Sequence, residues 1–220
     1  MKTAVAAVML AAAAGLSGTS QAADVPPIDA PTWFVFLETG RPTPADPPAV
    51  QAMQRGHIDN FKRLFSLGQL QAAGPMADPA RLKRGIVVVR AHSLADLKAY
   101  FQPDEYVREG YMTLNAVPAT ARQPLHTTGI DATKIEEVRI ALLPRPTPDA
   151  SASQRQACLQ ALVDAGKLGA WYTLNDGPLA EVLLARGTDT AALEATLAPC
   201  NGPAPQVWRQ WISPGVVGPR

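Results

Sequence analysis

Two hydrophobic patterns alternate along the chain. Short runs rich in aromatic and β-branched residues, such as residues 33–38, are typical of β-strands. Elsewhere apolar residues recur at spacings of three and four, as in residues 49–67, which predicts an amphipathic helix. The other predicted strands are residues 70–76, 85–90, 111–117, 137–143, 168–174, 180–186 and 206–212, and the other predicted helices are residues 93–102, 153–165 and 190–197.

The order strand, helix, strand, strand, helix, strand occurs twice, and short motifs recur with it. The matching pairs are Arg41-Pro42-Thr43-Pro44 with Arg145-Pro146-Thr147-Pro148, Leu67-Gly68-Gln69-Leu70 with Ala165-Gly166-Lys167-Leu168, Val87-Val88-Val89-Arg90 with Leu183-Leu184-Ala185-Arg186, and Pro118 with Pro214. Four matches in the same order favour an internal repeat. We predict one repeat in residues 32–118, a second in residues 135–214, and a polar linker in residues 119–134.

Each predicted repeat has the element order of a ferredoxin-like βαββαβ unit, an antiparallel sheet with two helices on one face. Residues 33–37 and 86–89 are apolar at every position, so both faces of the sheet are expected to be buried. The sheet of the second repeat can cover that of the first. We therefore predict an α+β fold in which two ferredoxin-like repeats form a single-chain, pseudo-dimeric α+β barrel.

Residues 1–22 have the pattern of a secretory signal peptide. Lys2 precedes an apolar run over residues 4–16, and small residues surround Gln21 at the expected cleavage site. The run is too short to span a bilayer as a helix, and no later segment approaches the ~20 apolar residues of a span. We expect a periplasmic or secreted protein that has no membrane segment after the signal is removed.

The charge of the chain is balanced. It has 20 Lys and Arg against 19 Asp and Glu, and loss of residues 1–22 removes Lys2 and no acidic residue, which leaves a formal charge of zero. This balance gives no electrostatic argument for nucleic acid or an anionic membrane as partner. Because one chain holds both predicted halves of the barrel, we expect a monomer or a weak dimer, with a small molecule as the possible ligand.

Two cysteines, Cys158 and Cys200, remain after the predicted signal peptide. An even pair in an exported protein is a disulfide candidate, because the oxidising compartment preserves such bonds. The alternative is a pair of buried thiols.

The first repeat resembles the YCII-related (YciI-like) family, small proteins of the dimeric α+β barrel group. The resemblance covers about residues 32–118 and is carried by His57 on the first helix, Gly68-Gln69-Leu70, Ala73-Gly74-Pro75 and the segment from Asp104 to Gly110. The family usually has Asp-Pro-Tyr-Val in that last segment, and here Glu105 replaces the proline. The second repeat resembles the family only in outline.

The resemblance implies that His57 and Asp104 form a histidine–aspartate pair at an active site, and it implies no particular substrate. His57 shares a helix face with apolar residues such as Met53 and Leu64, so the alternative is a partly buried histidine held by one hydrogen bond. Mapping the repeats onto each other places Cys158 at the position of Asn60, one helical turn after His57, and Cys200 at the position of Asp104. A bonded cysteine pair in the second repeat would bring the matching positions of the first together as well.

Other candidate residues follow from the same segments. Gly74 and Pro75 could let a ligand approach the backbone, although Gly-Pro more often ends a strand. Arg41 could anchor an anionic ligand, although a loop arginine is usually solvated. Three scattered histidines have no metal-site spacing, so we expect neither a metal nor a cofactor.

Two functions are consistent with these features. The first is an acid/base enzyme that moves a proton within a small organic molecule, as in an elimination or isomerisation, with His57 as the acid or base and Asp104 as the group that orients it. The second is a non-catalytic periplasmic module that binds a small ligand or a partner. The replacement of proline by Glu105, and Arg155 at the His57 position of the second repeat, favour the second function.

Overall fold

The computed structural model describes residues 27–146, 152–200 and 202–218. The predicted signal peptide, residues 1–22, lies outside the described residues. The first half of the chain contains β1 (Thr32–Thr39), α1 (Pro47–Ser66), β2 (Leu70–Pro75), β3 (Lys83–Arg90), α2 (Leu94–Tyr100), α3 (Glu105–Arg108) and β4 (Met112–Gln123). The second half contains β5 (Glu136–Pro144), α4 (Ala152–Asp164), β6 (Ala170–Leu174), β7 (Leu179–Ala185), α5 (Thr190–Leu197), the 3-10 helix η1 (Ala198–Cys200) and β8 (Gln206–Ile212).

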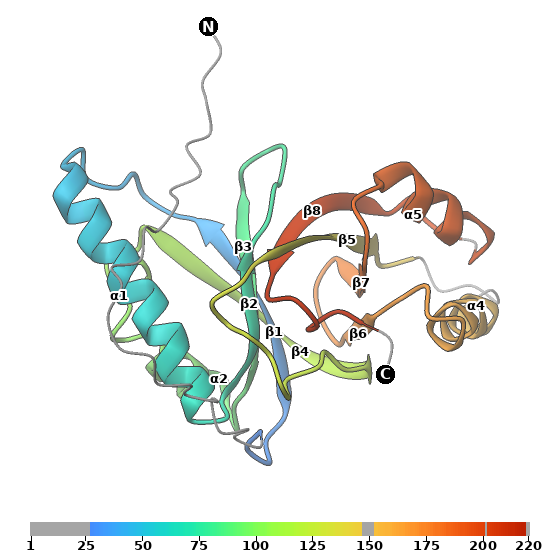
Figure 1. Cartoon of the computed structure of the whole chain (residues 1–220), viewed down its shortest axis with the longest axis horizontal. Helices are drawn as coiled ribbons and strands as arrows, with labels where there is room; N and C mark the ends of the chain where they lie inside the picture. The colour runs from blue at the N-terminus through green and yellow to red at the C-terminus, as the bar shows by residue number, and fades with distance from the viewer. Residues whose placement is uncertain (1–26, 147–151, 201, 219–220) are drawn as a thin grey trace, which may run out of the picture.

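All eight strands belong to one antiparallel sheet with the order β2-β3-β1-β4-β6-β7-β5-β8. The sheet curls until its two ends meet, where an isolated bridge joins Met76, just after β2, to Gln210 of β8. Figure 1 shows the resulting barrel with α1 and α2 outside it on one side and α4 and α5 outside it on the other. The predicted α+β barrel is therefore confirmed.

The two halves of the barrel join through β4 and β6. β4 runs on to Gln123, where Ala119 to Gln123 pair with Leu174 to Trp171 of β6. The prediction of a linker over residues 119–134 was therefore wrong for its first five residues. Pro118 obscured the continuation, because a proline within a strand pattern usually marks an end. Here Pro118 is exposed between buried Val117 and Ala119, so the strand alternation passes through it.

Both faces of the sheet are buried, as predicted, and each face has its own cluster of apolar side chains. The barrel interior is filled by side chains from both halves, including Phe34, Phe36, Ile140 and Tyr172. One outer cluster joins β1 and β3 to α1 and α2, and the other joins β5, β6 and β7 to α4 and α5.

Among the described residues, no helix is both long enough and apolar enough to cross a membrane.

The segment between β4 and β5 closes onto the barrel through Tyr172. The ring of Tyr172 is completely buried, and its hydroxyl oxygen accepts a hydrogen bond from the backbone N–H of Leu125, with 3.0 Å between nitrogen and oxygen. Burial raises the pKa of this phenol to about 12. The hydroxyl therefore serves as a neutral acceptor that satisfies a buried backbone donor.

We expect Tyr172→Phe to lower the free energy of unfolding by about 1–3 kcal/mol, because it leaves the N–H of Leu125 buried without an acceptor. Urea unfolding followed by fluorescence measures the change. Tyr111→Phe is the matched control, because Tyr111 is only half-buried. Equal stability of the two variants would contradict this account.

Candidate functional site

His57 lies on the buried face of α1. The side chains on this face are Met53, His57, Asn60 and Leu64, at the spacing that places residues on one side of a helix. Only 7% of His57 is exposed. His57 therefore lies on the same helix face as Met53 and Leu64, as the sequence pattern predicts.

Asp104 reaches His57 because the second helical region is interrupted. The predicted helix over residues 93–102 ends at Tyr100, and a separate one-turn helix, α3, begins after Asp104. Asp104 caps α3, since its Oδ1 accepts a hydrogen bond from the backbone N–H of Tyr106 at 3.0 Å. This cap holds the fully buried carboxyl group of Asp104 in one orientation, facing α1.

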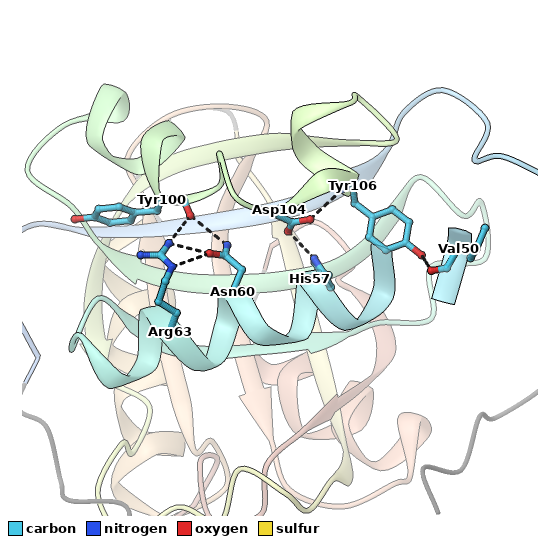
Figure 2. A network of polar contacts seen from close by, with 7 residues as sticks. All are labelled: Val50, His57, Asn60, Arg63, Tyr100, Asp104 and Tyr106. Atoms are coloured by element: carbon cyan, nitrogen blue, oxygen red, sulfur yellow. Dashed lines mark hydrogen bonds and ion pairs between the residues drawn. The ribbon is translucent and has the colours of Figure 1, made fainter. Parts of the chain in front are cut away.

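The two side chains meet directly. Nδ1 of His57 lies 2.6 Å from Oδ2 of Asp104, a short contact typical of a charge-assisted hydrogen bond. Figure 2 shows the contact between α1 and the start of α3. An ionised carboxylate can only accept, so Nδ1 carries the proton, and Nε2 keeps a lone pair whenever the ring is neutral. The pair therefore sets the tautomer that an acid/base histidine needs.

Aromatic rings enclose the imidazole. The ring centroids of Phe61 and His57 lie 4.4 Å apart. The ring of Tyr106 meets the imidazole edge-on, with 5.6 Å between the two ring centroids. Burial raises the pKa of Tyr106, the charge of Arg84 opposes that rise, and the charge of Asp104 adds to it. Tyr106 therefore stays protonated, and its hydroxyl donates a long hydrogen bond of 3.5 Å to the carbonyl oxygen of Val50.

A second polar contact fixes α1 against the end of α2. Nδ2 of Asn60 donates to the carbonyl oxygen of Tyr100 at 3.1 Å, and Arg63 donates to the same oxygen at 2.9 Å and to Oδ1 of Asn60 at 2.8 Å. Figure 2 shows this group one helical turn from His57. It satisfies the exposed carbonyl at the C-terminus of α2 and holds the distance between α1 and α2.

His57 faces a cleft of about 640 Å³ between α1 and the sheet. The wall is mostly apolar and comes from α1, β2, the start of β3, the end of β8, and the segment between β4 and β5. Asp104 does not line the cleft and lies behind His57. This volume lies in the usual range for a small-molecule site.

Gly74 and Pro75 line the cleft, as a ligand-binding role requires. A Cβ atom on Gly74 would lie 1.9 Å from the carbonyl oxygen of Trp211, so glycine is needed here for the close approach of β8. The packing of β2 against β8 thus accounts for Gly74 whether or not a ligand contacts it.

Arg41 lies apart from this group. Its Nε donates to the carbonyl oxygen of Glu109 at 2.6 Å, and its guanidinium stacks on the ring of Tyr111 at 4.3 Å. It is not among the residues that line the cleft. The structure therefore brings together His57, Asp104, Gly74 and Pro75 and leaves Arg41 outside.

Sequence reasoning missed the other polar residues of the cleft wall, among them Gln71 and Arg84. Gln71 is 5% exposed, and its amide oxygen has no hydrogen-bond partner among the residues that the structure describes. Both residues sit where strand register shifts, Gln71 in β2 between Leu70 and Ala72, and Arg84 in β3 opposite the shift between Leu37 and Glu38. A register shift leaves no signal in the hydrophobic pattern. The face of the sheet on which the side chains of Gln71 and Arg84 lie was therefore not predictable.

The second half fills the corresponding space. Ala73 pairs with Val87 between β2 and β3, and Trp171 occupies the equivalent place between β6 and β7, opposite Leu183. Nε1 of Trp171 donates to Oε2 of the buried Glu181 at 2.6 Å, and burial raises the pKa of Glu181 despite this bond. The pocket left there measures about 280 Å³.

A disulfide joins Cys158 of α4 to Cys200 of η1, with 5.2 Å between the two Cα atoms. The disulfide links α4 to the 3-10 helix that follows α5. In the first half, the contact between His57 and Asp104 links α1 to the segment after α2 in the same way.

No cluster of three or more His, Cys, Asp or Glu side chains that could hold a metal ion occurs in the part of the chain that the structure describes.

Comparison with known proteins supports the fold. No family model matches the chain, and no curated protein matches it. Among solved structures, the chain is similar to the crystal structure of a "putative monooxygenase" from Lactobacillus acidophilus NCFM, with a TM-score of 0.51 and 10% identity over 86% of this chain and 98% of the other. At this identity the likeness shows the fold alone.

We expect the neutral imidazole of His57 to carry its proton on Nδ1 and to leave Nε2 free. Long-range ¹H–¹⁵N correlation spectra distinguish the two nitrogens. Asp104→Ala should move the proton toward Nε2, because the carboxylate acceptor is gone. Exposed His92 is the internal reference, and a His57 spectrum that matches His92 in the unmodified protein would contradict the assignment.

We expect Ala73→Trp to close the cleft by copying the residue of the second half. Binding of a neutral apolar fluorophore, N-phenyl-1-naphthylamine, should weaken at least about tenfold, since burial of one aromatic ring contributes roughly 1.5–3 kcal/mol. The control is Leu82→Trp, which adds the same indole at a position that is 61% exposed and outside the cleft. Unchanged binding in Ala73→Trp would place the fluorophore elsewhere.

Proposed function

We propose that the protein is an enzyme that transfers a proton within a small organic molecule, in an elimination or an isomerisation. One observation carries the proposal: the bond between His57 and Asp104 lies at the wall of an apolar cleft, with the carboxylate behind the ring and Nε2 left for a ligand. No hydrogen bond to Nε2 of His57 occurs among the described residues.

In the proposed reaction, Nε2 of His57 takes a proton from a carbon next to an electron-withdrawing group. The ring then carries a positive charge, which the adjacent carboxylate of Asp104 stabilises. In an isomerisation the proton returns from Nε2 to a neighbouring atom. In an elimination the C–H electron pair forms a double bond, the leaving group departs with its bonding electrons, and Nε2 releases the proton to the leaving group or to water. Apolar walls strengthen these charge interactions, because few water molecules screen them.

The proposal extends to the organisation of the chain. We propose that residues 32–118 and 135–214 are tandem YCII-like repeats, on the strength of their common βαββαβ order and of the matching strand order in each half of the sheet. The second repeat has a disulfide in place of the acid/base pair and serves as the structural partner of the first. Because one chain supplies both halves, we propose a monomer or a weak dimer.

Export is part of the same proposal. The pattern of residues 1–22 supports it, and so does the disulfide between Cys158 and Cys200, since such bonds persist in oxidising compartments. We therefore propose a periplasmic or secreted protein that acts on a small molecule, with neither nucleic acid nor membrane as its partner.

A binding module without catalysis is the second candidate. It is favoured by Glu105, which follows Asp104 in place of the proline usual in the resembling family, and by the absence of a histidine at the position of Arg155. In that case the cleft would bind a ligand, and the His57–Asp104 pair would only hold α1 and α3 together.

Proton exchange distinguishes the two candidates. A panel of small apolar carbonyl compounds with acidic C–H groups is incubated with the protein in D₂O, and deuterium incorporation is followed by NMR. We expect at least one compound to exchange and His57→Ala to slow this exchange about 10²–10⁴-fold, the usual contribution of general acid–base catalysis. Asp104→Asn should give a smaller loss, because it keeps an acceptor for Nδ1.

His92→Ala is the control, because His92 is exposed and outside the cleft. Exchange that is equally fast in His57→Ala would contradict the acid/base proposal. Tight binding of panel compounds with no exchange in any variant would favour the binding module.

A further inference from the structure

We infer that the ligand of the cleft is an apolar molecule with one acidic group, such as a carboxylate, and that Arg84 binds this group. The inference rests on the proposed function, because it names the substrate class of the same cleft. It depends on the charges of the cleft wall, on the free guanidinium of Arg84, and on the apolar surface between Arg84 and His57.

The wall of the cleft is positively charged. Lys62 and Arg84 line it, and no Asp or Glu does. The carboxylate of Asp104 lies behind the imidazole of His57, with which it is hydrogen-bonded. The lining of the cleft therefore includes positive charge and no carboxylate, which favours an anion.

Arg84 is the cation that is free to bind a ligand. Its neighbour Lys83 pairs with Glu38 at 3.7 Å, and Lys62 pairs with Asp59 at 3.3 Å. Within the described parts of the chain, the guanidinium of Arg84 makes no ion pair and no hydrogen bond. Arg84 is exposed at the cleft wall, so an incoming acidic group does not have to displace a partner.

Arg84 lines the cleft from β3, and His57 lines it from α1. The charge of Arg84 acts on the phenol of Tyr106, whose ring contacts that of His57. A guanidinium binds a carboxylate through two parallel hydrogen bonds, which fixes the direction of the bound molecule as well as its position. Arg84 would thus orient the rest of the ligand toward Nε2 of His57.

The remaining wall suits an apolar body. The side chains of Phe61, Phe65, Leu70, Ile86 and Met112 line the cleft, and Ile130 from the segment between β4 and β5 covers it. A volume of about 640 Å³ accommodates one or two rings. The cleft therefore combines an apolar lining with the unpaired guanidinium of Arg84, which can select one end of the ligand.

Two fluorescent probes test the inference with the full chain. 1-Anilinonaphthalene-8-sulfonate carries one negative charge, and N-phenyl-1-naphthylamine is the same ring system without it. We expect Arg84→Gln to weaken binding of the anionic probe about tenfold, as for loss of a hydrogen bond to a charged group, and to change binding of the neutral probe less than about twofold. Arg84→Lys should retain most of the affinity for the anion.

Arg55→Gln is the matched control, because Arg55 is exposed on α1 and outside the cleft, and it should alter neither affinity. Equal losses for both probes in Arg84→Gln, or no loss for either, would overturn the inference. Neither probe needs to react, so the result does not depend on catalysis. Arg84-dependent binding in a protein that exchanges no proton would contradict the proposed function and still support this inference.

Discussion

The structure depends on one constraint, which is that the central strands of the sheet are apolar on both faces. In β1, Phe34 and Phe36 point into the barrel, and Val35 and Leu37 point toward the helices. Such a strand is stable only if apolar groups cover both sides, because every exposed face would lose the free energy of burial. Curling the sheet buries one face against itself, and the helices then have to cover the outside. The cleft arises in this outer layer, where α1 does not fully cover the small residues of β2 and β3.

The two halves solve the same packing problem with different side chains. In the first half, the small residues Ala73 and Gly85 leave space between the helix and the sheet. In the second half, Trp171 and Glu181 stand at the equivalent positions, and their side chains fill the corresponding space. A tryptophan–glutamate pair buries a large ring and satisfies its own polar atoms, so it closes the layer without a ligand. A few differences in side chain therefore distinguish the two halves. As a result, the open volume lies in the first half, next to His57.

Much of the fold was predictable, because its strands and helices follow hydrophobic patterns. The apolar faces that these patterns predict are the faces that pack in the core. The strand over residues 206–212 and the helix over residues 190–197 have the predicted bounds. The extension of β4 to Gln123 was not predictable, since its partner strand lies in the other half of the chain. Proximity of His57 and Asp104 was accessible only through the resemblance and the mapping of the repeats. The cleft and the position of Arg84 in its wall depend on strand register and on the volumes of side chains from several elements. No local sequence pattern encodes these properties.

Stability alone gives a poor reason for the pair of His57 and Asp104. A buried ion pair loses the hydration of both groups, and its replacement by apolar side chains is often neutral or stabilising. The second half ties the corresponding elements with a disulfide, which stabilises a fold by typically about 2–4 kcal/mol. The fold thus has a stronger tie available for this place. A histidine that is held in one tautomer at the wall of an apolar cleft can exchange a proton with a bound molecule, as we propose, and a disulfide cannot.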